Sequence, residues 1–71
     1  MALNEEYAAL SADQKRMVDG VVAEARRTKQ QARRASGGFD YYAYPHPGGG
    51  IAWGVDGPPH GFNIRRGVMP K

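Results

Sequence analysis

The side chains of this sequence that could act as nucleophiles, general bases or metal ligands are few and far apart. Ser11 and Ser36 have no histidine near them, and His46 and His60 lie among prolines and glycines, as is usual for exposed loops. The glycine run 48–50 lacks the lysine and the following helix of a phosphate-binding loop. With no cysteine and two histidines, the chain has too few ligands for a closed zinc site. We therefore expect no catalytic residue, no metal and no cofactor, and a protein that is not an enzyme.

Cationic side chains are concentrated in one short stretch and recur near the C-terminus. Arginines on one side of a helix can contact successive phosphates, and nearby tyrosines could stack on unpaired bases. The same cations also complement the negative end of a helix dipole, which is a purely structural explanation. The net charge of +3 permits an anionic partner without demanding one. The candidate nucleic-acid-binding residues are Arg26, Arg27, Lys29, Arg33, Arg34, Arg65 and Arg66.

Aromatic side chains are the second candidate feature, and all but one of them follow residue 37. Such rings add a large buried area at low entropic cost and often dominate protein interfaces. The candidate partner-binding residues are Tyr41, Tyr42, Tyr44, Trp53 and Phe62. The alternative is that the rings form the core of a small hairpin packed on the N-terminal half. The residues they would contact there are Tyr7, Leu10, Met17 and Val21.

The elements that would position these side chains divide the chain in two. Residues 1–36 contain one glycine and no proline, which favours helix. The segment 11–14 has the capping-box pattern, so a long helix should begin directly after Ser11, with a short helix upstream. We expect this amphipathic helix to run to about Ala35 and to stop at Gly37.

Residues 37–71 contain all but one of the ten glycines and all five prolines. Residues 39–44 and 50–55 are plausible strands around the breaker 45–49, which predicts a β-hairpin, and residues 62–65 are a third short strand or an extended arm. One face of the second strand would be large and the other nearly bare, which invites another surface to lie on it. The large face would carry Ile51, Trp53 and Val55, and the bare face Gly50, Ala52 and Gly54.

The fold expected is a small α+β unit: a short helix, a long amphipathic helix, and a β-hairpin or extended arm rich in glycine, proline and aromatic residues. The helical segment 1–36 and the segment 37–71 should form one structural unit rather than two domains. Chains of this size without disulfides or metals often need oligomerisation to hold a unique fold. We therefore expect a protein partner or a second copy of the chain.

Our leading functional hypothesis is a non-enzymatic accessory or structural subunit that docks onto a larger protein assembly, for example a virion capsid or tail component. The alternatives are a small basic nucleic-acid-binding or ribonucleoprotein protein and a small inhibitor of a host enzyme. No run of about 20 apolar residues is available to span a membrane, and the N-terminus carries carboxylates where a signal peptide is positive. We expect a soluble protein of the cytoplasm or a virion, with no small-molecule substrate.

Overall fold

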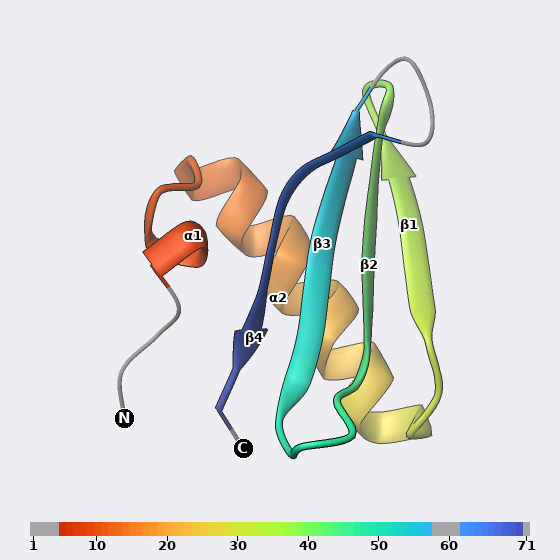
Figure 1. Cartoon of the computed structure of the whole chain (residues 1–71). Helices are drawn as coiled ribbons and strands as arrows, with labels where there is room; N and C mark the ends of the chain where they lie inside the picture. The colour runs from red at the N-terminus through yellow and green to blue at the C-terminus, as the bar shows by residue number, and fades with distance from the viewer. Residues whose placement is uncertain (1–4, 58–61, 71) are drawn as a thin grey trace.

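The computed structural model describes residues 5–57 and 62–70, with the backbone alone for residues 62 and 63. Four antiparallel strands form one sheet in the order β1-β2-β3-β4, and two helices precede it in the chain (Figure 1). The small α+β fold is therefore confirmed. The elements are α1 (Glu5–Ala8), α2 (Ala12–Thr28), β1 (Ala32–Ser36), β2 (Phe39–Pro45), β3 (Ile51–Gly57) and β4 (Phe62–Met69).

The long helix α2 ends at Thr28, and the prediction that it continues to about Ala35 was wrong. Lys29 caps the helix in the left-handed conformation, with φ 57°. Beyond this point a continued helix would have had only alanine to bury, whereas the strand β1 pairs with β2 over its whole length. Gly37 and Gly38 do not cap a helix. Their φ angles of 57° and 87° form the tight turn between β1 and β2, where two positive φ angles match the twist of the strands.

The start of α2 follows the sequence prediction. The Ser11 hydroxyl accepts a hydrogen bond from the Gln14 backbone N–H at 3.1 Å, and the Gln14 side chain accepts one from the Ser11 backbone N–H at 3.0 Å. The reciprocal pair satisfies two of the N–H groups that every helix start leaves without an intrahelical acceptor. The capping box is confirmed.

The strands after the turn were also predicted: β2 covers the segment 39–44, and β3 covers the segment 50–55 except for its first residue. The expected third strand is β4, which continues to Met69 and so completes a sheet rather than an arm. A register shift between Val55 and Asp56 leaves Ile64 as an extra residue in β4.

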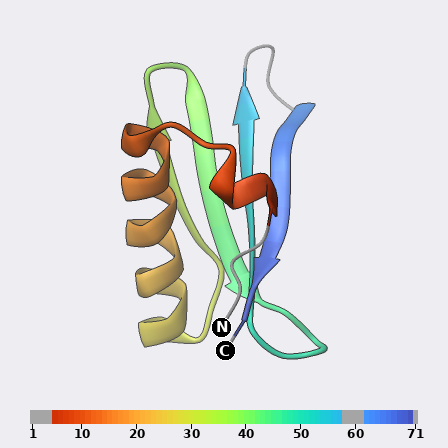
Figure 2. The ribbon, with the colours of Figure 1, turned by 90° about the vertical axis from the view of Figure 1, so that its left-hand side faces the viewer.

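Both helices lie on one side of the sheet, with α2 across β1, β2 and β3 and α1 beside β4 (Figures 1 and 2). The core between helices and sheet draws on both halves of the chain, so each half buries the apolar side chains of the other. In the described part of the chain, no helix covers the opposite face. The buried cluster consists of Tyr7, Leu10, Val18, Val21, Val22, Ala25, Ala32, Tyr41, Ala43, Ile51, Trp53, Val55 and Met69.

Candidate functional site

The uncovered face of the sheet is built from rows of residues that pair across the strands. Paired residues of neighbouring strands point to the same face, so the register determines which side chains meet there. Two adjacent rows are Arg33-Tyr42-Gly54-Arg66 and Tyr44-Ala52-Val68. The first row has an arginine at each end, whereas the second contains no charged side chain.

A groove of about 460 Å³ runs over β3 between the side chains of β2 and β4. The β3 residues on this face, Ala52 and Gly54, are small, as the sequence predicted, and Ala52 lines the groove. The ring of Tyr42 lies over Gly54, where a Cβ atom would overlap it. Tyr42 and Tyr44 are parallel, with ring centroids 6.4 Å apart and an angle of 6° between planes. Among the residues that line the groove are Tyr42, Tyr44, His46, Ala52, Arg66 and Val68.

The two ends of the groove differ in chemistry. At the apolar end, the side chains of Tyr44 and Val68 are 39% and 38% exposed. At the polar end, the exposed Arg66 lies near the half-buried Tyr42. Burial raises the pKa of Tyr42, and the carboxylate of Asp56 raises it further, with a partly opposing effect of the nearby arginines. The Tyr42 phenol therefore stays protonated at neutral pH.

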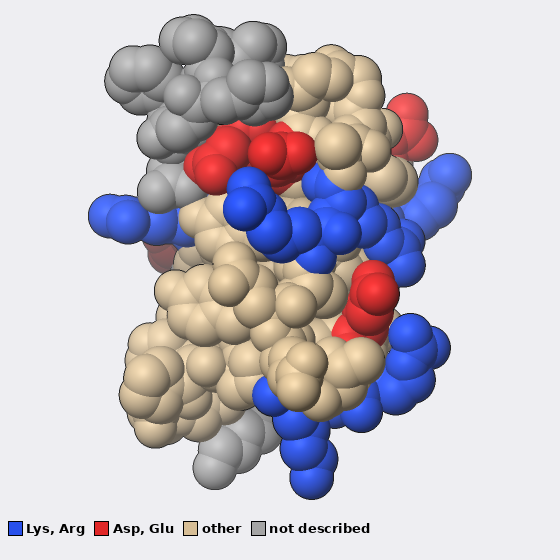
Figure 3. Space-filling view, turned by 90° about the vertical axis from the view of Figure 1, so that its right-hand side faces the viewer, with Lys and Arg blue, Asp and Glu red and all other residues tan. Residues whose placement is uncertain are grey.

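Several of the cationic residues predicted for nucleic-acid binding are engaged within the chain. Ion pairs join Arg33 to Asp40 at 3.3 Å, Arg34 to Glu24 at 3.5 Å and Arg65 to Glu6 at 3.3 Å. Arg26 donates a hydrogen bond to the Pro70 carbonyl at 2.8 Å. Figure 3, which views the molecule from the side of β1, shows carboxylates interspersed among the basic side chains.

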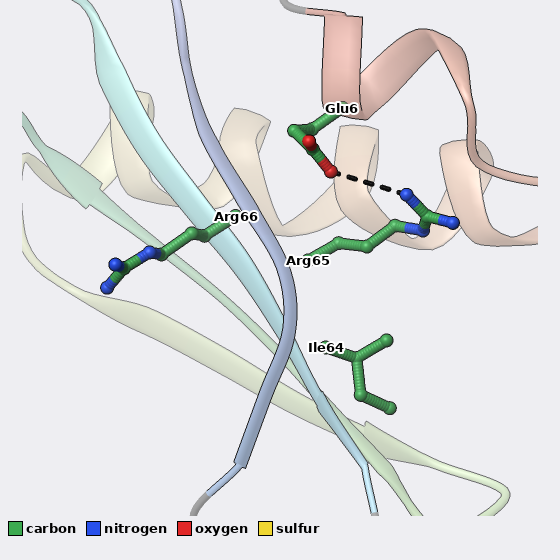
Figure 4. A pocket seen from close by; sticks show the side chains of 4 residues that line it. All are labelled: Glu6, Ile64, Arg65 and Arg66. Atoms are coloured by element: carbon green, nitrogen blue, oxygen red, sulfur yellow. Dashed lines mark hydrogen bonds and ion pairs between the residues drawn. The ribbon is translucent and has the colours of Figure 1, made fainter.

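The basic residues also point in different directions. Arg65 extends toward α1, whereas Arg66 leaves the other side of β4 (Figure 4). Arg27 and Lys29 are exposed at the C-terminal end of α2. A second hollow, of about 420 Å³ at the edge of β4, includes the Glu6–Arg65 ion pair and the exposed Ile64. The basic side chains therefore form no single continuous surface among the described residues.

The predicted aromatic residues separate into two groups. Tyr41 and Trp53 are 5% and 1% exposed and belong to the core, where Trp53 meets the ring of Tyr7 edge-on at a centroid distance of 6.0 Å. Tyr42 and Tyr44 line the groove. The side chain of Phe62 lies outside the described part of the structure.

Sequence reasoning missed Val68 as a groove residue. The signal that could have found it is the alternation along β4, in which Val68 shares a face with Arg66 once the strand is known to reach Met69. The exposed His46 lies at one end of the groove, and His60 falls outside the described residues.

Comparisons with protein-family models, with curated proteins and with solved structures found no match. Within residues 5–57 and 62–70, no three histidine or acidic side chains are grouped so that they could hold a metal ion. None of the described helices is long and apolar enough to cross a membrane.

Proposed function

We propose that the chain is a non-enzymatic docking subunit that binds a partner protein through the groove on the open face of its sheet. The observation that carries the proposal is the pair Tyr44 and Val68, two large side chains more than one-third exposed on either side of the small Ala52. Tyrosine and arginine around an apolar centre are the residue types that most often dominate binding energy at protein interfaces.

The area of the open face indicates how tightly a partner could bind to it. Four strands about 4.8 Å apart and about 20 Å long give a face of roughly 400 Å². A stable one-to-one interface buries about 800 Å² on each partner. The groove alone therefore supports a modest affinity, which suits a subunit held in a larger assembly by several contacts at once. A virion component is one such setting.

The charge distribution favours a protein over a nucleic acid. Arg33, Arg34 and Arg65 are paired with carboxylates, and Asp40 and Asp56 lie in the row beside Tyr42 on the open face. A phosphate backbone would have to displace these pairs and approach two carboxylates.

The test is purification of the tagged full-length chain, with the recovered partners identified by mass. Tyr44→Asp and Val68→Asp place a charge in the groove, and Ala12→Asp adds the same charge at the exposed start of α2 as a matched control. Circular dichroism verifies that all three variants fold. We expect the wild type and Ala12→Asp to recover the same partner and both groove variants to lose it.

Other outcomes would replace the proposal. Recovery that survives both groove substitutions would contradict docking in the groove. Release of the bound material by nuclease, with affinity that falls steeply with salt, would identify a nucleic-acid-binding protein instead. A complex of one chain with one enzyme would identify an inhibitor rather than an assembly subunit.

A further inference from the structure

We infer that the groove binds an extended peptide segment of the partner in which an apolar and an acidic residue are separated by one residue. This inference rests on the proposed docking function. The apolar side chain would lie between Tyr44 and Val68, and the carboxylate would lie beside Arg66.

The spacing follows from the geometry of β4. Val68 and Arg66 are two positions apart on one strand and point to the same face, so their Cα atoms are about 7 Å apart. An extended peptide repeats its side chains on one face at the same interval of about 7 Å. A segment lying along β3 would therefore place every second side chain opposite one row of the open face. The small Ala52 lines the groove, whereas the ring of Tyr42 lies over Gly54.

The charge preference follows from the surroundings of Arg66. Arg33, at the other end of the same row, is paired with Asp40. Among the described residues, Arg66 forms no ion pair of this kind, and its side chain is exposed at the groove. A partner carboxylate at this position would gain a charge-assisted hydrogen bond.

The neighbouring row limits where a second acid could lie. Asp40 and Asp56 pair in the row beyond Tyr42, so a carboxylate two positions past the first would meet like charge. Docking on the face of the sheet does not fix the direction of the segment. The recognised pattern is therefore apolar-x-acidic or its reverse, with no further acid on the side of the aspartates.

The experiment is selection of a displayed library of random linear heptapeptides on the full chain. Wild type, Arg66→Gln and Arg66→Glu are compared, with Tyr44→Asp as the blocked-groove control. We expect peptides enriched on the wild type to carry an apolar and an acidic residue at a spacing of two. The Arg66→Glu chain should select lysine or arginine at the acidic position, and Arg66→Gln should keep the apolar preference alone.

The affinity is measured with a synthetic peptide of the selected sequence, which is titrated into the ¹⁵N-labelled chain and followed by NMR. Because Arg66 is exposed, Arg66→Gln should weaken binding of the acidic peptide about two- to fivefold. The shifted amides should be those of β2, β3 and β4 around the groove.

Three results would overturn the inference. They are no enrichment over Tyr44→Asp, an unchanged charge preference on Arg66→Glu, and a dimer of the chain that is abolished by Tyr44→Asp. The last would mean that a second copy occupies the groove. If the groove variants lose a folded partner in the purification test while no peptide pattern is selected, the docking function stands and only this inference fails.

Discussion

The hydrogen bond from Tyr7 to Asp19 links α1 to α2. The substitution Tyr7→Phe removes this hydrogen bond and keeps the aromatic ring. The Tyr7 hydroxyl donates to Asp19 Oδ1 at 2.6 Å, and the ring is 7% exposed, edge-on to Trp53. A hydrogen bond to a charged group contributes about 1.5–3 kcal/mol, and we take the lower end because Asp19 is exposed to water. A loss of about 1.5 kcal/mol should lower Tm by about 6–12 °C in a domain of this size.

The assay is thermal and urea unfolding followed by far-UV circular dichroism. Tyr44→Phe is the matched control, because it removes the same hydroxyl from an exposed ring and should change stability by less than about 0.5 kcal/mol. In a double-mutant cycle with Asp19→Ala, the destabilisations should be less than additive by about 1 kcal/mol. Equal Tm values for Tyr7→Phe and Tyr44→Phe, or additive losses in the cycle, would mean that the Tyr7–Asp19 hydrogen bond does not stabilise the fold.

The same bond predicts a pH dependence. The hydrogen bond to Asp19, followed by burial and the charge of that carboxylate, raises the pKa of Tyr7 to about 12 from 10.0. The folded state thus favours the neutral phenol, so this contribution to stability is complete below pH 10 and is lost as the pH rises toward 12. Urea midpoints between pH 9 and 12 should fall less steeply for Tyr7→Phe than for the wild type.

Three further substitutions test local features of the fold by urea unfolding. Ser11→Ala removes the capping hydroxyl and should lower the free energy of unfolding by about 1 kcal/mol, while Ser11→Asp, which can still cap, should not. Gly20→Ala should raise the free energy of unfolding by up to about 1 kcal/mol, because alanine favours helix and only the flexible end of Arg34 must move. A lower free energy of unfolding would mean that the Arg34 side chain is fixed there. Gly50→Ala should lower the free energy of unfolding by about 3 kcal/mol, because φ is 80° and the new Cβ would overlap the carbonyl oxygen of Met69. An unchanged free energy of unfolding would contradict this turn geometry.

The parts of the fold that local signals determine could be predicted from the sequence. The capping box at Ser11 and the two strands around the breaker 45–49 depend on residues close together in the chain. The end of α2 could not be predicted in this way. Residues 30–36 contain no glycine or proline, and residues 32–36 form the strand β1 because the turn at Gly37 and Gly38 brings them beside β2.

The candidate site was only partly visible in the sequence. Alternation predicted the bare face of β3, but it could not tell which neighbouring tyrosine faces the helix, since Tyr41 and Tyr42 have the same residue type. The register settles this question by pairing Tyr41 with Val55 and Tyr42 with Gly54. Contacts between distant residues, such as the ion pair of Glu6 with Arg65, leave no local signal at all.

Photo-crosslinking in living cells tests the docking groove most directly. A photoreactive amino acid replaces Val68 in the groove or, as the control, the exposed Ala23 of α2. We expect a discrete protein crosslink from position 68 that disappears when Tyr44→Asp is added, and none from position 23. A crosslink that forms equally from position 23, or one from position 68 that survives Tyr44→Asp, would contradict docking through the open face of the sheet.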